Sequence, residues 1–400
     1  TDIGIIALER ESSRNYKRDS RPFLDYRVFA RFYAKALGAK LIYADSMIRS
    51  ETYNKLENGE AYEYNKASFR PLFPAQTEVF IANNKTGKSV RAIEAGTIAF
   101  LKENREAGKR QFILSPRRGL APRTICRNCG KGLLCENCGG ALVLHGAKRQ
   151  KPDDVTVYVC HRCGDAADSM IRCRHCESWD LIPFRIGTEQ IEIELKELFP
   201  KQDIIRFDRD TIKTETDAVK AMRKFEVPGS ILIGTEISFS YLAEKIDAVL
   251  VIFPELLTSV PEYTGDENAL RFILRAKSLA SIKFAIQTAE PELPIIKWSE
   301  NANLADFYRR EIELRKSLRY PPFGTLVLIT YAKNAAIQKQ IEESFAAYQP
   351  TFFEGMGDSK EERVFFRMEN KNWPDAKFRE LCLSLPQNCA VEVMPERLFS

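Results

Sequence analysis

Long hydrophobic stretches are absent from this sequence of 400 residues. No apolar run reaches about eighteen residues, which excludes a membrane-spanning helix and a membrane partner. No signal-peptide pattern opens the chain, and there is neither a low-complexity tract nor a repeat of fixed period. Hydrophobic residues make up 44% and charged residues 29%, the composition of a soluble globular protein. At this length we expect about two to four domains.

Histidine is scarce, at three residues, whereas cysteine follows a pattern. Eight of the ten cysteines form four Cys-x2-Cys pairs, separated by five, twenty-one and nine residues. Two intervening residues let one tight turn offer both thiolates to a tetrahedral ion, so four pairs satisfy two zinc ions. The candidate zinc ligands are Cys126, Cys129, Cys135, Cys138, Cys160, Cys163, Cys173 and Cys176. Three histidines are expected at the surface or beside the ligands, although one could replace a cysteine: His145, His161 and His175.

Three other uses of paired cysteines fit this pattern less well. Disulfides require an oxidising compartment, which the absence of a secretory segment disfavours. Iron–sulfur clusters usually take their ligands from Cys-x2-Cys-x2-Cys runs, and a redox site needs one pair rather than four. We therefore predict two structural Zn²⁺ ions as cofactors of a cytoplasmic protein.

The cysteine-rich stretch is also basic. Between Arg117 and Arg185 there are twelve Lys/Arg and seven Asp/Glu, a net charge of +5 that equals the net charge of the whole chain. Such a localised positive surface suggests contact with phosphate, although a solvated surface around a metal gives the same pattern. The candidate DNA-binding residues are Arg117, Arg118, Arg127, Lys148, Arg149, Arg162, Arg172 and Arg174. Tyr158 and Trp179 could stack on bases or pack in the core.

Strand and helix patterns alternate along most of the chain. Short apolar runs followed by amphipathic helices predict α/β units with a parallel sheet. The predicted strands are 3–8, 39–44, 77–82, 111–115, 203–207, 230–233, 248–253 and 283–288. The predicted helices are 26–37, 92–106, 190–198, 217–225, 267–280 and 304–318. Because the basic stretch lies between the strand 111–115 and the helix 190–198, we predict an insertion within one α/β domain.

One tract imitates a phosphate-binding loop. Lys85 to Ser89 reads as the end of that loop, but the glycine required five residues before Gly87 is Ala82. We therefore predict no phosphate site there. The loops after the first two strands, 9–12 and 45–50, occupy the carboxyl-end position where parallel sheets bind ligands.

A small α+β module is predicted at the end of the chain. Pro321 and Pro322 stop the charged helix 304–318, because proline cannot continue the helical hydrogen bonds. The strands and helices predicted beyond them are 326–331, 335–347, 363–367, 375–383 and 390–393. Cys382 and Cys389 lack the paired spacing, so we expect ordinary buried thiols.

Short tracts on either side of the insertion form a specific set. They lie at 117–119, 186–190, 194–195, 198–200, 207–211, 233–235 and 318–323. Together with the eight cysteines, this set resembles the PriA family of bacterial replication-restart helicases (primosomal protein N′), over most of the chain. The resemblance implies RecA-like helicase lobes. It also implies that Cys126, Cys129, Cys173 and Cys176 share one zinc ion, and that the second and third pairs share the other.

The chain departs from that family at its ATPase motifs. The family's Asp-Glu-Glu-His appears here as Glu9, Arg10, Glu11 and Ser12, so Arg10 replaces the acid that orients the attacking water. Three further motifs are changed, at 45–47, 240–242 and 275–277. We therefore predict that no catalytic residue is intact and that ATP hydrolysis is lost. Binding of ATP and Mg²⁺ without hydrolysis stays open, as does a misalignment of short loops in an active enzyme.

The expected fold is thus α/β, with RecA-like lobes, a two-zinc insertion and an α+β C-terminal domain. The predicted domains are 1–70 (remnant of a first helicase lobe), 71–123 with 181–300 (second lobe), 124–180 (zinc insertion), 301–322 (linker helix) and 323–400 (C-terminal domain). Because the first strand begins almost at Thr1, we expect a chain truncated at its N-terminus.

These features predict a non-catalytic protein of replication restart. We expect it to bind forked or single-stranded DNA and to recruit replication-restart or single-strand-binding proteins. Two alternatives remain: an active ATP-dependent 3′–5′ DNA helicase, and a zinc-stabilised scaffold for protein interactions.

Overall fold

A computed structural model describes residues 3–18, 20–64, 69–82, 91–116, 123–145, 157–168, 170–200, 202–260, 262–354 and 361–396. The chain divides into two compact units, one of Phe69–Leu304 and one that combines Thr1–Ser68 with Ala305–Ser400. None of the helices in these ranges has both the length and the apolarity that crossing a membrane requires.

A six-stranded sheet organises the described part of the unit Phe69–Leu304. Its order is β10-β11-β4-β12-β13-β3, and every neighbouring pair is parallel. The predicted apolar runs are confirmed as these strands. The central strands β4, β11 and β12 are mostly apolar because helices cover both faces of a parallel sheet. The bounds are β3 (Gln76–Ile81), β4 (Gln111–Leu114), β10 (Ile204–Phe207), β11 (Ile231–Gly234), β12 (Ile246–Ile252) and β13 (Ala280–Thr288).

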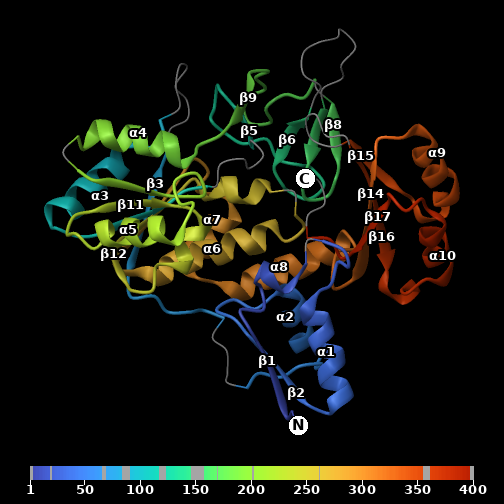
Figure 1. The fold of residues 1–400 in the computed structure, drawn as a ribbon. Coiled ribbons are helices and arrows are strands. Elements are labelled where there is room, and N and C mark those ends of the chain that lie inside the picture. The colour runs from blue at the N-terminus through green and yellow to red at the C-terminus, as the bar shows by residue number, and fades with distance from the viewer. Residues whose placement is uncertain are drawn as a thin grey trace. The chain divides into compact units, whose positions relative to one another are not determined.

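Helices lie on both sides of this sheet (Figure 1). Side chains alternate between the two faces of a strand, so Leu250 and Ile252 of β12 enter a core shared with α3 and α4. Val249 and Val251 are left for the opposite face, and α6 packs against β12 and β13. The bounds are α3 (Ala95–Glu106), α4 (Thr188–Leu198), α5 (Glu215–Phe225), α6 (Gly265–Leu279) and α7 (Pro294–Asn301).

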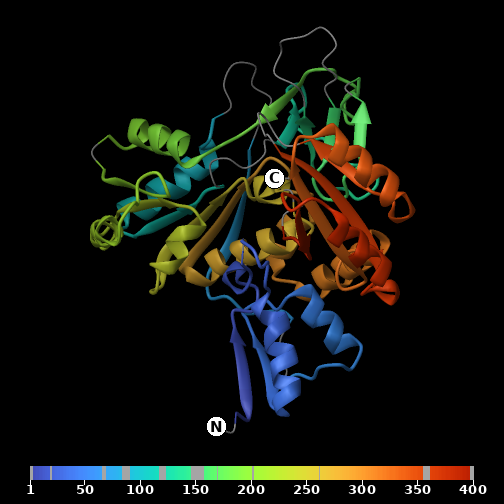
Figure 2. The same ribbon diagram turned by 45° about the vertical axis from the view of Figure 1, so that its right-hand side comes forward.

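The cysteine-rich insertion leaves the sheet after β4 and rejoins it at α4. Its described residues form two small antiparallel sheets, β5 with β9 and β6-β7-β8, which Figure 2 shows in green at one end of the unit. The strands are short because the chain reverses at each cysteine pair. Their bounds are β5 (Arg123–Cys126), β6 (Leu142–His145), β7 (Val157–Cys160), β8 (Ala166–Asp168) and β9 (Leu181–Phe184).

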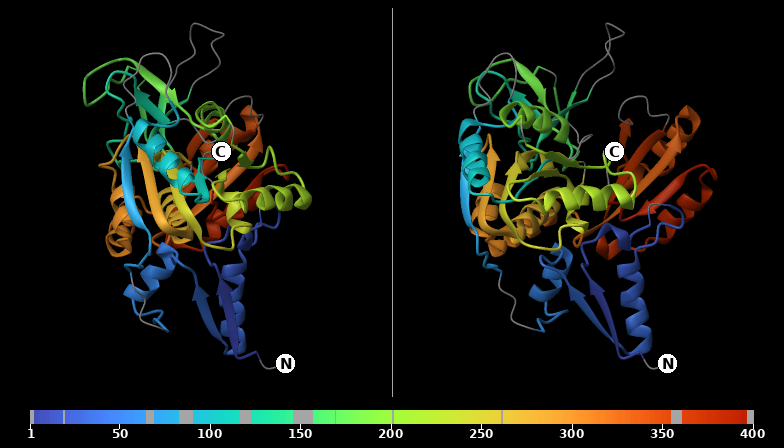
Figure 3. Two further views of the ribbon diagram at one scale, coloured as in Figure 1. Left: turned by 90° about the vertical axis from the view of Figure 1, so that its left-hand side faces the viewer. Right: turned by 60° about the vertical axis from the view of Figure 1, so that its left-hand side comes forward.

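The other unit begins with a parallel pair of strands, β1 (Ile5–Glu9) and β2 (Lys40–Ala44), with α1 beside them (Figure 3). Helix α1 spans Tyr26–Leu37, as predicted from the sequence. The Asp25 carboxylate caps its start and Gly38, at φ 66°, ends it in the left-handed conformation that glycine adopts readily. A second helix, α2 (Ser50–Glu57), was not predicted.

The C-terminal part of this unit is the predicted α+β module. Four described strands form an antiparallel sheet in the order β15-β16-β14-β17, and α9 and α10 share one core with it. Strand β15 was not predicted. The bounds are α8 (Leu304–Ser317), β14 (Gly324–Ala332), α9 (Ala335–Ser344), β15 (Thr351–Glu354), β16 (Glu361–Glu369), α10 (Ala376–Ser384) and β17 (Ala390–Val393).

Charged side chains join the N-terminal segment to this module. Arg27 of α1 pairs with Glu396 at 3.0 Å, and Lys17 pairs with Glu392 at 2.6 Å. The N-terminal and C-terminal segments therefore fold as one unit. The assignment of residues 1–70 to a remnant of a first helicase lobe stays a prediction.

Candidate metal centres

Each cysteine pair sits in a turn of one type. The amide four residues after the first cysteine donates to that cysteine's carbonyl oxygen, at 2.7–2.9 Å in all four turns. The donating residue has a positive φ each time, and three of the four donors are glycines. The donors are Gly130, Gly139, Gly164 and Glu177. A glycine after Cys-x2-Cys was therefore a further signal in the sequence, which the prediction did not use, and Glu177 is the exception to it.

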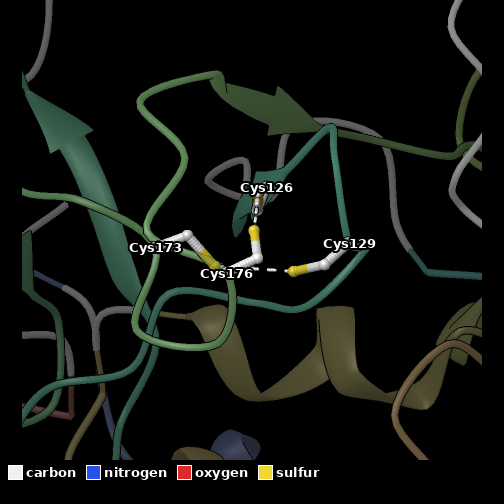
Figure 4. Close-up of side chains that lie close together, drawn as sticks. All are labelled: Cys126, Cys129, Cys173 and Cys176. Carbon is white, nitrogen blue, oxygen red and sulfur yellow. Dashed lines mark hydrogen bonds between the residues drawn. The ribbon is translucent and has the colours of Figure 1, made fainter.

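The turns bring the eight cysteines into two groups of four, and within each group the sulfur atoms lie within 4.8 Å of one another. Cys126, Cys129, Cys173 and Cys176 form the outer cluster, in which the side chains turn their sulfur atoms toward one another (Figure 4). Cys135, Cys138, Cys160 and Cys163 form the inner cluster. These groups join the first pair to the fourth and the second to the third, the pairing that the resemblance implied.

The sulfur spacing suits a tetrahedral ion. Cys126 and Cys176 lie 3.6 Å apart and Cys138 and Cys160 lie 3.4 Å apart, sulfur to sulfur. A tetrahedral ion with bonds of about 2.3 Å separates its sulfur ligands by about 3.8 Å. Each cluster could therefore hold one zinc ion. Burial raises the pKa of the Cys129 thiol to about 12, so uptake of a metal, which binds the thiolate, would release protons.

The two clusters differ in exposure. All four cysteines of the inner cluster are buried, whereas Cys129 and Cys176 of the outer cluster are half-buried. His161, between two inner-cluster cysteines, is 1% exposed, and its Nδ1 lies 3.1 Å from the carbonyl oxygen of Ser259. His175, in the last pair, is exposed, while the side chain of His145 lies outside the described residues. No histidine in the described residues joins either group of ligands.

The predicted DNA-binding arginines fall into two environments. Around the outer cluster, Arg127 and Arg174 remain exposed, although each pairs with a carboxylate of the insertion, Asp180 and Glu136 respectively. Arg162 of the inner cluster is instead 13% exposed and pairs with Asp266 of α6. Four further candidates lie outside the described residues: Arg117, Arg118, Lys148 and Arg149.

Arg172 and Trp179 form an exposed pair beside the outer cluster. The guanidinium carbon of Arg172 lies 4.3 Å from the centroid of the Trp179 ring, and the Trp179 side chain is 50% exposed. Tyr158, by contrast, is 6% exposed and packs in the core of the insertion. Of the two aromatic candidates for base stacking, therefore, only Trp179 is accessible.

Counting charges placed Arg123 on the basic surface, and the structure corrects this. Its side chain is 1% exposed and lies 2.7 Å from the carboxylate of Glu290, at the carboxyl end of β13. The Glu290 carboxylate also accepts the amide of Gly132, at 2.9 Å. A Cβ at Gly132 would lie 2.5 Å from Arg123 Nε, so the backbone approaches this pair closely. The sequence carries no signal that separates Arg123 from its exposed neighbours.

The residues predicted to be degenerate ATPase positions differ in their surroundings within the described part of the chain. The Glu11 carboxylate is 1% exposed and accepts hydrogen bonds from Arg49 N and Thr52 Oγ1, both at 2.8 Å, at the start of α2. Burial raises the pKa of Glu11 above its ordinary value. Glu9 and Arg10 are exposed, and Arg10 has a φ of 51°. The amide of Ser12 donates to Asp45 at 3.0 Å, which joins the two loops after β1 and β2.

Two residues of the tracts that were predicted to be changed ATPase motifs also make local contacts. Arg275 donates to the carbonyl oxygen of Phe239 at 2.8 Å, and its guanidinium lies 4.7 Å from the Phe239 ring centroid. The hydroxyl of Tyr241 donates to Glu215 at 3.0 Å. The phosphate-loop imitation at 85–89 lies outside the described residues.

Two tracts of the resemblance meet at the carboxyl end of β10. The hydroxyl of Thr188, the first residue of α4, donates to Asp208 at 2.6 Å. The other oxygen of Asp208 accepts the amides of Asp210 and Thr211, which fixes the turn after the strand. Farther along α4, the Glu194 carboxylate accepts the amide of Ala92 at 2.7 Å. The tracts at 186–190 and 207–211 are therefore in direct contact, whereas the tract at 194–195 contacts the segment before α3.

The parallel sheet and its insertion define the class of protein. It is an α/β protein that carries two four-cysteine groups, each able to hold a metal ion, in an insertion after a strand of the sheet. No protein-family model matches the chain.

Comparison with curated proteins identifies the relatives. The chain is 28% identical to the replication restart protein PriA of Thermotoga maritima over 346 residues, which cover 84% of this chain and 45% of that protein. It is 25% identical to PriA of Borreliella burgdorferi (85% and 51%) and 24% identical to PriA of Bacillus subtilis (82% and 41%). The chain spans about half the length of the curated relatives it matches. It is a divergent PriA-like protein.

Proposed function

We propose that this chain acts in replication restart by binding forked or single-stranded DNA, with two zinc ions as its structural cofactors and without hydrolysis of ATP. In this proposal, residues 71–123 and 181–300 act as a RecA-like lobe that carries the insertion. The similarity to proteins named replication restart protein PriA supports a role in replication restart. The two groups of four cysteines, whose sulfur atoms lie within 4.8 Å of one another, support the two zinc ions.

The observation that carries DNA binding is the exposed surface beside the outer cluster. This outer surface consists of Arg127, Arg172, Arg174 and Trp179. Arginine side chains contact phosphates, and an exposed aromatic ring beside an arginine offers a stacking platform for an unpaired base. Because such a platform needs an unstacked base, we propose a preference for single-stranded DNA and for the single-stranded parts of forks.

The surroundings of Glu11 support the loss of hydrolysis. A catalytic carboxylate must reach the metal or the attacking water, but the Glu11 oxygens are engaged at the start of α2, so this carboxylate is not available to take over the role of the acid that Arg10 replaces. Its neighbour Arg10 brings a positive charge to the position where the family has an acid. We therefore propose that α2 depends on Glu11 for its N-terminal hydrogen bonds and that the site no longer turns over ATP.

A titration against fork, single-stranded and duplex DNA at two salt concentrations tests the proposal, with zinc content determined on the same sample. We expect two zinc ions per chain, one for each cysteine group, and binding to fork and single-stranded DNA that weakens steeply with salt, since phosphate contacts release counterions. DNA-stimulated ATP hydrolysis by the complete gene product would instead favour the active helicase. Zinc without any DNA binding would favour a protein scaffold.

A further inference from the structure

The inner cluster contacts the α/β layers through two residues that lie inside the third Cys-x2-Cys pair of the chain. His161 and Arg162 lie between Cys160 and Cys163, and neither side chain points to solvent. In the outer cluster, Arg127 and Arg174 occupy the position equivalent to His161, directly after the first cysteine of each pair, and form ion pairs within the insertion. The two metal centres therefore have different neighbours.

His161 contacts the segment that follows β12. This segment is the 3-10 helix η3 (Pro254–Ser259), and the carbonyl oxygen of Ser259 lies 3.1 Å from His161 Nδ1. Since a carbonyl oxygen can only accept, the imidazole donates this hydrogen bond from Nδ1. The contact is buried, so its loss would leave the carbonyl oxygen without a partner in a place where water cannot readily replace it.

Arg162 links the same turn to α6 and to the second cysteine pair. Its guanidinium forms an ion pair with Asp266, in the first turn of α6, and donates to the carbonyl oxygen of Cys138 at 3.2 Å. The packing is tight there, because a Cβ at Gly140 would lie 3.1 Å from Arg162 Cβ and 3.0 Å from Cys160 Sγ. Arg162 therefore bridges the inner cluster and the helix layer.

The positions of His161 and Arg162 depend on the turn that holds them. Both flanking residues, Cys160 and Cys163, are candidate metal ligands, so an ion that fixes the two sulfur atoms also fixes the two side chains between them. Without the ion, four neutral thiols give the turn only weak contacts.

We propose that a metal ion in the inner cluster anchors the insertion to η3 and α6 through His161 and Arg162, whereas an ion in the outer cluster does not serve this contact. The inference rests on the proposed zinc binding. It assigns separate tasks to the two ions: the inner ion fixes where the insertion sits on the α/β layers, and the outer ion shapes the outer surface.

Hydrogen exchange measured by mass spectrometry on the full chain tests this division, with Cys163→Ser and Cys176→Ser as the matched pair. Each variant should lose one of two zinc ions. In Cys163→Ser we expect the amides of 259–270 to exchange about tenfold faster, because their contacts with the inner cluster are released. In Cys176→Ser we expect them to exchange as in the unchanged chain. The anchor is overturned if the two variants alter this segment equally or leave it unchanged.

A charge exchange tests the same contact with both ions retained. Arg162→Asp should accelerate exchange in the first turn of α6, and the double variant Arg162→Asp with Asp266→Arg should restore it, at unchanged zinc content. A single variant that exchanges like the unchanged chain contradicts the anchor. If the unchanged chain binds no zinc at all, the proposed metal binding fails instead, and the zinc assay separates these two failures.

Discussion

The guanidinium of Arg123 lies 2.7 Å from the carboxylate of Glu290, and both side chains are buried. Arg123 opens β5 of the insertion, and Glu290 follows β13 of the parallel sheet. This ion pair therefore connects the base of the insertion to the carboxyl end of the sheet. Arg123 also donates to the carbonyl oxygen of Glu255 at 3.3 Å, so one guanidinium bridges two loops of the α/β layers.

Replacing Arg123 by methionine should lower the free energy of unfolding by about 3–5 kcal/mol, because it leaves the Glu290 carboxylate buried without its cation. Urea unfolding of the zinc-loaded chain measures the change. Gly132→Ala should act in the same direction, since its Cβ would fall 2.5 Å from a Glu290 oxygen.

Arg127→Met is the matched control for this prediction. Arg127 lies in the same insertion and pairs with Asp180 at 3.5 Å, but both side chains are about half exposed. An exposed ion pair contributes less than about 1 kcal/mol, so the control should unfold almost like the unchanged chain. Equal losses in the two variants would contradict the role given to the buried pair.

Stability should fall with rising pH because of Glu255. The pKa of Glu255 is raised from 4.5 to about 7. Burial is the largest cause and the neighbouring Glu290 carboxylate the second, while Arg123 acts in the opposite direction. Between these values the folded chain keeps a proton that the unfolded chain has lost, so the free energy of unfolding decreases as pH rises through this window. The full difference corresponds to about 3 kcal/mol.

Glu255→Gln should remove this decrease, because the amide does not titrate. The stability of the variant relative to the unchanged chain should therefore rise between pH 5 and pH 7.5, as measured by urea unfolding. The substitution also alters hydrogen bonds from Thr288 and Ala289, but that cost should not depend on pH. A difference that stays constant over this range would show that Glu255 is already ionised in the folded chain at pH 5.

Glu177→Gly should stabilise the fourth cysteine turn. Glu177 has a φ of 56°, where the equivalent residues of the other turns are glycines. The left-handed conformation costs a residue with a side chain about 1 kcal/mol, and glycine would remove this cost. Part of the resulting gain in stability is lost, because glycine has greater conformational freedom in the unfolded chain. We expect the melting temperature of the zinc-loaded chain to rise slightly. Gly164→Ala, the reverse change in the third turn, should lower it; a melting temperature lowered by both would contradict the argument.

Trp179→Ala should weaken binding of single-stranded DNA by about 5- to 150-fold, the range that corresponds to the loss of one stacked base. Fluorescence anisotropy with a labelled single strand measures the change. Trp179→Phe keeps an aromatic face and should retain most of the affinity. If alanine and phenylalanine weaken binding equally, or neither does, Trp179 is not a stacking platform.

Local patterns predicted much of the fold because local forces determine those elements. Helix α1 was predicted to its first and last residue, since its amphipathic pattern ends at a glycine that adopts a positive φ. Helix α2 was missed because it is short and polar, and because the carboxylate that contacts its start, that of Glu11, lies far earlier in the chain. No window of sequence around 50–57 contains that information.

In the candidate metal centres, too, local sequence predicted some features, whereas others depend on residues far apart in the chain. Spacing alone identified the eight cysteines, but their grouping came only from a resemblance, since spacing permits other groupings. Charge counting placed Arg123 and Arg162 on one basic surface, although the structure buries one and pairs the other with Asp266. Such pairs join residues far apart in the sequence, so composition cannot reveal them.

The most direct test compares the DNA affinity of two triple variants, each of which reverses three positive charges on a different surface. One variant carries Arg127→Glu, Arg172→Glu and Arg174→Glu on the outer surface. The matched control carries the same change of net charge on exposed residues of α5, as Lys220→Glu, Arg223→Glu and Lys224→Glu.

Affinity for fork and single-stranded DNA is measured at one salt concentration, with zinc content verified to be equal in the two variants. The account predicts that the outer-surface variant loses at least about tenfold more affinity than the control, because only its arginines contact phosphates. Equal losses in the two variants, or a greater loss in the control, would contradict the assignment of DNA binding to the insertion.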